Sequence, residues 1–226
     1  MDVNTAPVIL KAKIDHTHTI IWLHGLGADG HDFAPLAPSF NWPFVKFIFP
    51  HAKHRPISIN GGRVMRGWYD ILSFERGQHE DERGILESSL EVQKLIQKEL
   101  ELGIPADHIF LAGFSQGGAI ALYAGLTFEH QLAGILALST YLPIENLLKQ
   151  NQGLLQIKTP ILICHGDDDS VLPLFLAEHA RESLKAMGCE DINFKIYPMD
   201  HSVCPEEIMD IKQWVMKFFL KNKSEK

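Results

Sequence analysis

Cysteine is scarce in this sequence, and its arrangement argues against a disulfide framework and against a zinc site. The three cysteines, Cys164, Cys189 and Cys204, are odd in number and lack the spacing of metal ligands. The simplest interpretation is that they are reduced thiols in a cytoplasmic protein. A catalytic cysteine is the alternative, but none of the three lies on a turn of the kind that presents a nucleophile.

Long apolar runs and an excess of positive charge are also missing. No segment approaches the roughly 20 apolar residues that span a bilayer. The N-terminus has only Val8-Ile9-Leu10 before Lys11, which is no signal peptide. We therefore expect a cytoplasmic protein without stable membrane insertion. The formal net charge is −7 and the basic residues are scattered, so no nucleic-acid partner is expected.

The composition that is present fits a globular protein of one domain. Apolar and charged residues make up 46% and 22% of the chain, which is close to the average of soluble globular proteins and unlike that of disordered or fibrous ones. No linker, repeat or low-complexity stretch divides residues 1–226, so we expect a single domain over the whole chain.

Apolar segments rich in β-branched residues alternate with helical patterns, which predicts an α/β fold. One helix is expected from about Ile85 to Leu102, and the last helix opens with Pro205. Such alternation predicts a mostly parallel sheet with helices on both faces and a site beyond the carboxyl ends of its strands. The expected strands are Thr19–Leu23, Val45–Phe49, Ile109–Ala112, Gly134–Ser139, Pro160–Cys164 and Ile192–Tyr197.

The clearest motif follows the strand Ile109–Ala112. The run Gly113-Phe114-Ser115-Gln116-Gly117-Gly118 contains G-x-S-x-G and leads into a helix of small residues, which is the strand–turn–helix setting of a nucleophile elbow. A side chain at Gly113 or Gly117 would collide with neighbouring backbone, and the strained turn would project Ser115 at a helix N-terminus. The bare pattern arises by chance in roughly one chain in ten of this length. Its placement favours a nucleophile over the alternative, an idle serine in a glycine-rich turn.

A serine nucleophile needs a base and an acid that orients the base, and both are sought downstream on turns that follow strands. The strand Ile192–Tyr197 is followed by His201, which is the best base among the four histidines after Ser115. The strand Pro160–Cys164 leads into the adjacent aspartates Asp167, Asp168 and Asp169. Two of these are expected to be solvated, and the residue pattern alone does not decide which of the three is the acid.

The oxyanion of an acyl-transfer intermediate needs two N–H donors. One is expected from the backbone of Gln116, directly after the nucleophile, and the other from Leu26 in the turn His24–Gly27. The same turn begins a G-x-G-x-x-G pattern typical of dinucleotide sites. That interpretation is set aside because Pro35 and Pro38 interrupt the following stretch, where such a site needs a clean helix start. No cofactor and no metal are expected.

Together these segments resemble the carboxylesterase and acyl-protein thioesterase family, which also has lysophospholipase-type members. The resemblance covers nearly the whole chain. It is carried by Leu23-His24-Gly25-Leu26-Gly27, Pro50-His51-Ala52, Arg55-Pro56, Trp68-Tyr69-Asp70, Gly113-Phe114-Ser115-Gln116-Gly117-Gly118, Leu138-Ser139-Thr140-Tyr141-Leu142-Pro143, His165-Gly166-Asp167-Asp168-Asp169 and His201-Ser202. It implies an α/β-hydrolase fold without the large lid of true lipases, and it allows a homodimer, although no residue pattern indicates an interface.

The family pattern also assigns residues. Its catalytic acid is the third residue after a His-Gly pair, which is Asp169 here, and it supports Leu26 and Gln116 as oxyanion donors. It implies an acyl groove near Leu26, Trp68 and Tyr141, where Tyr141 replaces a common tryptophan. For Trp68, the alternative role is that of a core aromatic residue.

A loop next to this groove combines apolar and charged residues. Leu72 and Phe74 lie beside a cluster of charged residues, and we expect them to form a mobile flap over the groove.

The expected function is that of a serine carboxylesterase with the triad Ser115, His201 and Asp169 and an acyl-enzyme intermediate. Small esters, thioesters of S-acylated proteins and lysophospholipids are the candidate substrates. Alternatives are a dedicated acyl-protein thioesterase, an acyltransferase that excludes water, and a non-catalytic domain that binds an acylated ligand. The last is disfavoured because all three triad residues are present.

Overall fold

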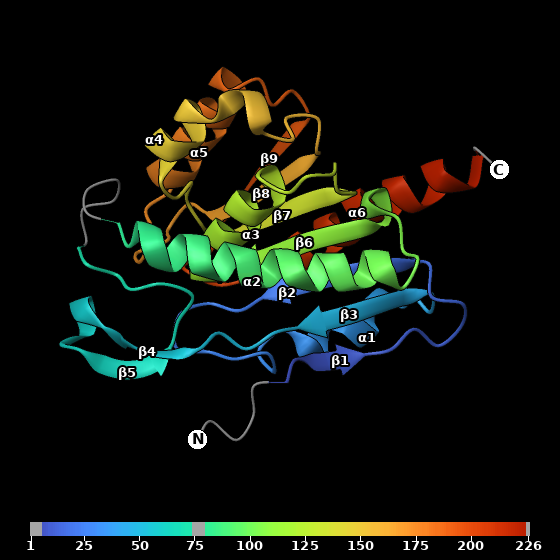
Figure 1. The fold of residues 1–226 in the computed structure, drawn as a ribbon, viewed down its shortest axis with the longest axis horizontal. Helices are drawn as coiled ribbons and strands as arrows, with labels where there is room; N and C mark the ends of the chain where they lie inside the picture. Colours follow the sequence, from blue (N-terminus) through green and yellow to red (C-terminus); the bar gives the residue numbers. More distant parts are fainter. Residues whose placement is uncertain (1–5, 74–79, 225–226) are drawn as a thin grey trace.

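The computed structural model describes residues 6–73 and 80–224, so Phe74 of the expected flap lies outside the described residues. A seven-stranded sheet runs through the middle of the structure (Figure 1), in the order β1-β3-β2-β6-β7-β8-β9. All neighbouring pairs are parallel except β1 and β3. The strands are β1 (Val8–Leu10), β2 (His18–Leu23), β3 (Val45–Phe49), β6 (Ile109–Phe114), β7 (Gly134–Leu138), β8 (Ile161–Gly166) and β9 (Ile192–Tyr197). Every strand expected from the sequence is present.

Helices cover both faces of the sheet, as the sequence predicts. They are α1 (Ala37–Phe40), α2 (Glu82–Glu101), α3 (Gln116–Leu126), α4 (Glu145–Gln150), α5 (Phe175–Ala186) and α6 (Pro205–Ser224), with short 3-10 turns at Ala34–Leu36, Ser58–Asn60, Ala106–His108 and Gln152–Leu154. In the described part of the chain, no helix combines the length and the apolar character needed to cross a bilayer.

The two faces of the sheet pack against different helices because successive side chains of a strand alternate in direction. In β6, Ile109 and Leu111 join the core cluster that includes buried residues of α2, α3 and α5. Phe110 and Ala112 join the cluster that includes α1 and α6. Burial on both faces explains why the central strands are continuous apolar runs.

A small hairpin of β4 (His54–Ile57) and β5 (Arg63–Arg66) lies apart from the main sheet (Figure 1). It was not expected from the sequence, because its strands hold charged residues and a proline rather than an apolar alternation. Gly61 and Gly62 close it with φ angles of 66° and 78°, which glycine adopts without strain. The hairpin matters for the site because its end contacts the turn after β2.

The carboxyl ends of the parallel strands place the expected site residues at one edge of the sheet. The register pairs Phe114 of β6 with Leu138 of β7, Leu138 with Cys164 of β8, and Gly166 of β8 with Tyr197 of β9. The turns after β6, β8 and β9 therefore leave the sheet at the same edge, with only β7 between β6 and β8. These are the turns that carry the predicted nucleophile, acid and base.

Candidate active site

Ser115 lies on a strained turn between β6 and α3. Its φ and ψ angles are 53° and −121°, a conformation that is rare for a residue with a side chain and is typical of functional sites. A Cβ atom at Gly113 would lie 2.2 Å from the Gly117 carbonyl oxygen, and one at Gly117 would lie 2.5 Å from that of His24. The close approach expected for both glycines is therefore confirmed.

The turn is held in place by backbone and side-chain hydrogen bonds. Ser115 donates its N–H to the Leu138 carbonyl at 2.8 Å, and Thr140 Oγ1 donates to the Ser115 carbonyl at 2.7 Å. Residues at the end of β7 and just after it thus fix the backbone that presents the serine hydroxyl.

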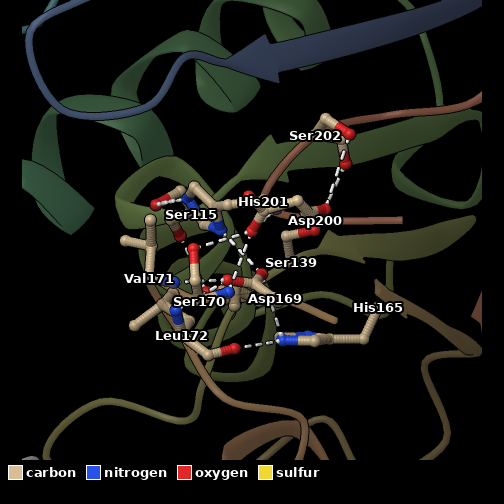
Figure 2. Close-up of polar contacts among 11 residues, drawn as sticks. Ser115, Ser139, His165, Asp169, Ser170, Val171, Leu172, Asp200, His201 and Ser202 are labelled. Carbon is tan, nitrogen blue, oxygen red and sulfur yellow. Dashed lines mark hydrogen bonds and ion pairs between the residues drawn. The ribbon is translucent and has the colours of Figure 1, made fainter. Parts of the chain in front are cut away.

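Ser115, His201 and Asp169 form a continuous hydrogen-bonded row (Figure 2). His201 Nε2 is 2.9 Å from Ser115 Oγ, and His201 Nδ1 is 2.7 Å from Asp169 Oδ2. A carboxylate oxygen only accepts, so Nδ1 carries the proton in this contact. Nε2 is then free to accept the proton of the serine hydroxyl, which is the arrangement that a general base requires.

Burial and hydrogen bonding separate Asp169 from its two neighbours. The Asp169 residue is 5% exposed, and its Oδ1 accepts the N–H groups of Val171 at 3.0 Å and Leu172 at 2.7 Å. Asp167 and Asp168 are exposed. The turn therefore directs one carboxylate toward His201 and leaves two in solvent, as expected for this cluster.

His165 lies against the side of Asp169 that faces away from solvent, and the sequence interpretation did not assign it a role. It is fully buried, and its Nε2 donates to the Leu172 carbonyl at 2.7 Å while lying 3.4 Å from Asp169 Oδ2. Burial lowers the pKa of His165, which favours the neutral form of the ring. Its place near the end of the apolar, buried strand β8 was the only signal for this role.

Asp200 holds the backbone of His201, the expected base. Its Oδ1 accepts the backbone N–H of His201 at 2.8 Å. The backbone N–H of Ser170 lowers the pKa of this carboxyl, and the N–H of His201 contributes as the next cause. The sequence interpretation missed this residue because an aspartate next to a histidine in an exposed turn has no distinctive pattern.

The turn after β2 holds Leu26 against the nucleophile. His24 is buried and donates from Nδ1 to the Gly25 carbonyl at 2.7 Å, while its Nε2 accepts the Ala52 N–H at 3.0 Å. Burial lowers the pKa of His24 to about 4. Gly27 donates to the Arg66 carbonyl at the end of β5 at 2.8 Å. The hairpin thus clamps the turn that carries the expected oxyanion donor.

Gln116 connects the nucleophile turn to the segment after the hairpin. Its side-chain Oε1 accepts the Trp68 N–H at 2.8 Å, and its Nε2 donates to the Tyr69 carbonyl at 2.7 Å. The Gln116 backbone N–H belongs to the first turn of α3, where N–H groups have no partner within the helix. The side chain positions residues 68–69, and the backbone is left for a ligand.

A cavity of about 280 Å³ opens at the row of hydrogen-bonded residues. Tyr141 lines it, as expected, whereas Trp68 does not; the indole of Trp68 donates to the His24 carbonyl at 2.8 Å instead. Tyr69 lines the cavity in its place. Leu72 is 48% exposed and lies outside the lining. The lining residues are Gly25, Leu26, Ala28, Asp32, Tyr69, Ile71, Phe114, Ser115, Gln116, Tyr141, Val171, Leu172 and His201.

One group of side chains near the oxyanion turn has the composition of a metal site. Among the described residues, Asp29, His31 and His51 have potential ligand atoms within 4.8 Å of one another. Some of the polar atoms of this group are already paired, because Gly30 donates its N–H to His51 Nδ1 at 3.0 Å and Asp29 Oδ1 accepts from His31.

Comparisons with known proteins match this chain to phospholipases, carboxylesterases and acyl-protein thioesterases. A family model described as phospholipase/carboxylesterase matches residues 4–219. An acyl-protein thioesterase 1 of Neurospora crassa is 42% identical over 92% of this chain and 90% of its own length, and one of Cryptococcus neoformans is 38% identical over 92% and 95%. Among solved structures, acyl-protein thioesterase 2 of Zea mays superposes with a TM-score of 0.84 at 28% identity, covering 95% of this chain and 99% of that one. SOBER1 of Arabidopsis thaliana superposes with a TM-score of 0.84 at 32% identity, covering 90% and 99%.

Proposed function

The chain belongs to the phospholipase/carboxylesterase family of α/β-hydrolases, and we propose that Ser115, His201 and Asp169 are the triad with which it cleaves acyl thioesters of proteins. It is a serine hydrolase that acts on ester or thioester bonds. The observation that carries the assignment of the triad is the row of hydrogen bonds from Asp169 through His201 to the strained Ser115.

In the acylation step, His201 Nε2 takes the proton of Ser115 Oγ as this oxygen attacks the acyl carbonyl carbon. Asp169 keeps the imidazole in the tautomer that accepts this proton and stabilises the imidazolium that forms. His201 then returns the proton to the departing thiolate or alkoxide. The acyl group remains on Ser115 as an ester.

Two backbone N–H groups stabilise the negative charge on the carbonyl oxygen in each tetrahedral intermediate. Gln116 provides one from the first turn of α3, and Leu26 provides the other from the turn clamped by the hairpin. Removal of one such donor costs about a hundredfold or more in rate. In deacylation, His201 activates a water molecule that attacks the acyl carbonyl and regenerates Ser115.

The relatives and the cavity support the proposed substrate class. Acyl-protein thioesterases share about 40% of their residues with this chain over most of its length. The cavity next to Ser115 includes apolar side chains such as Ile71, Phe114 and Leu172, which suit an acyl chain rather than a charged group. The thiol side of a protein thioester leaves toward the solvent.

Hydrolysis of an S-acylated peptide and of its oxygen-ester analogue tests the proposal. We compare the wild type with Ser115→Ala and with Ser39→Ala, an exposed serine of α1 that serves as a matched control. The wild type and Ser39→Ala release free thiol at the same rate, and Ser115→Ala loses activity by several orders of magnitude. Equal activity of wild type and Ser115→Ala would refute the assignment of the nucleophile.

The other outcomes identify the alternatives. If the wild type binds the acylated peptide but releases no acyl group, a non-catalytic acyl-binding domain replaces the proposal. If added alcohol diverts most of the acyl group into a new ester, the protein is an acyltransferase. A rate on the oxygen ester far above that on the thioester would make it a carboxylesterase of simple esters.

A further inference from the structure

Trp68 lies between the two turns that carry the proposed oxyanion donors, and it is 4% exposed. Its backbone N–H donates to Gln116 Oε1 at 2.8 Å, and its indole Nε1–H donates to the His24 carbonyl at 2.8 Å. The indole also packs near the imidazole of His24, with ring centroids 5.2 Å apart. One residue therefore holds the nucleophile turn through its backbone and the turn after β2 through its side chain.

The bond to the His24 carbonyl acts on the peptide that carries the donor. The N–H of Leu26 belongs to the same planar, trans peptide unit as the Gly25 carbonyl, so the two groups point in opposite directions. His24 Nδ1 donates to the Gly25 carbonyl at 2.7 Å, which sets the direction of the Leu26 N–H. Trp68 holds the peptide unit directly before it, through the His24 carbonyl. Two successive peptide planes are thus fixed up to the proposed donor.

The turn depends on such bonds from outside because Leu26 stands between two glycines. Gly25 and Gly27 have more conformational freedom than other residues, so the turn has little stiffness of its own. Gly27 donates its N–H to the Arg66 carbonyl at 2.8 Å. Since Trp68 follows Arg66 by two residues, one short segment holds the turn on both sides of Leu26.

Trp68 is itself anchored to the rest of the structure. Its carbonyl accepts from the hydroxyl of Ser88 in α2, and Gln116 Nε2 donates to the carbonyl of Tyr69, the next residue, at 2.7 Å. Gln116 thus binds this segment with both polar atoms of its side chain, while its backbone N–H is the other proposed oxyanion donor. A continuous path of hydrogen bonds therefore connects the two donors through Trp68.

We propose that Trp68 is a positioning residue that sets the spacing of the two oxyanion donors. The inference rests on the proposed function. An oxyanion donor must lie about 3 Å from the charged oxygen, and a misplacement of about 1 Å costs on the order of a hundredfold in rate. Trp68 does not line the catalytic cavity, so it acts on the rate through the donors and not through contact with the acyl chain.

The first test is the variant Trp68→Phe, which removes the indole N–H and keeps a buried aromatic ring. We expect kcat for thioester hydrolysis to fall by about tenfold to a hundredfold, with KM within about twofold of wild type. Trp42→Phe is the matched control. Trp42 is 8% exposed, and among the described residues its indole N–H has no hydrogen-bond partner. This control should keep wild-type kinetics.

Two inhibitors separate a displaced donor from a general loosening of the site. With an acyl trifluoromethyl ketone, Ser115 Oγ adds to the carbonyl carbon, the serine proton passes to His201 Nε2, and the carbonyl oxygen becomes an oxyanion. A thioether analogue with the same chain has no carbonyl oxygen. In Trp68→Phe we expect the inhibition constant of the ketone to rise by the factor by which kcat falls, and that of the thioether to stay unchanged.

Gln116→Met breaks the same path at its other end and keeps the backbone N–H. We expect it to lower kcat and to weaken the ketone but not the thioether, so it also tests the inference if Trp68→Phe does not fold. The double variant should lose about as much kcat as the more damaging single variant, because either change interrupts the path. A loss equal to the product of the two single effects would overturn the inference.

The inhibitor series also distinguishes this inference from the proposed function. Wild-type kcat in folded Trp68→Phe would overturn the positioning role, and so would equal weakening of the ketone and the thioether. Either result leaves the triad assignment in place, because the wild type still hydrolyses the thioester. Failure of the proposed function would appear in the wild type itself, as absent hydrolysis and a ketone that binds no more tightly than the thioether.

Discussion

The carboxylate of Asp200 holds Ser170 by two hydrogen bonds, one from its backbone N–H and one from its hydroxyl, each 2.9 Å long. Ser170 directly follows Asp169, the proposed catalytic acid, and Asp200 directly precedes His201, the proposed base (Figure 2). The contact therefore joins the turn after β8 to the turn after β9. Because the same oxygen accepts the His201 N–H, Asp200 fixes the distance between acid and base.

Replacement of Asp200 by alanine should lower activity through position rather than through chemistry. We expect Asp200→Ala to reduce kcat/KM by about tenfold to a hundredfold, since a misplacement near 1 Å costs on the order of a hundredfold. Its melting temperature should change little, because the residue is exposed. Asp168→Ala, another exposed aspartate in the neighbouring turn, is the control and should keep wild-type kinetics. Wild-type kcat/KM in Asp200→Ala would contradict this role.

Asp169→Asn should disable the base while leaving the fold intact. The asparagine oxygen can still accept the two backbone N–H groups that bind Oδ1, so its NH₂ group faces His201 Nδ1. A donor at that point forces the proton to Nε2, where it blocks acceptance from Ser115. We expect kcat to fall by about 10⁴-fold. Asp167→Asn, in the same turn but exposed, should retain activity, and equal losses in the two variants would point to a general effect of charge.

Glu207 makes the protein less stable as pH rises from about 4.5 to about 8. It is fully buried in the first turn of α6, and burial raises its pKa from 4.5 to about 8. Between these values the unfolded chain releases a proton that the folded chain retains, so the free energy of unfolding decreases as pH rises, by at most about 1.4 kcal/mol per pH unit. Glu207→Gln should flatten this slope in urea unfolding at about pH 5 and about pH 8. Glu206→Gln, at the exposed neighbouring position, should keep the wild-type decrease of the unfolding free energy with pH. If Glu207→Gln has the same pH slope as wild type, Glu207 is not the cause of this decrease.

His18 acts in the opposite direction at acid pH. It is 6% exposed and packs on the rings of His108 and Phe219. Burial, followed by repulsion from His108 and His16, lowers its pKa from 6.5 to about 3. As pH falls from about 6.5 to about 3, His18 binds a proton in the unfolded chain but not in the folded chain. The free energy of unfolding therefore decreases over this pH range.

The variant His18→Phe should therefore be less sensitive to acid. We expect its melting temperature to fall less than that of wild type between about pH 6.5 and about pH 4. Removal of an exposed histidine, in His130→Phe, should leave the acid dependence unchanged. A steeper acid loss in His18→Phe than in wild type would contradict the assignment.

Much of this protein follows from local sequence. Buried parallel strands must be apolar on both faces, so strands such as β7 and β8 are recognisable from composition alone. The elbow around Ser115 is recognisable because its glycines are required wherever backbone approaches backbone. His201 follows from its place on a turn after a strand. These features depend on contacts close in sequence or on the general rule that sites form at the carboxyl ends of strands.

Only the tertiary structure shows which aspartate contacts His201 and which aromatic residue lines the cavity, because both depend on residues far apart in sequence. Three adjacent aspartates are equivalent as a residue pattern, and Asp169 is distinguished by burial and by contact with His201. Because neighbouring side chains point in different directions, Tyr69 rather than Trp68 lines the cavity. Its bond to Tyr141 joins residues 72 positions apart. Such a pairing leaves no local periodicity, so it becomes visible only once the turns after β5 and β7 are packed together.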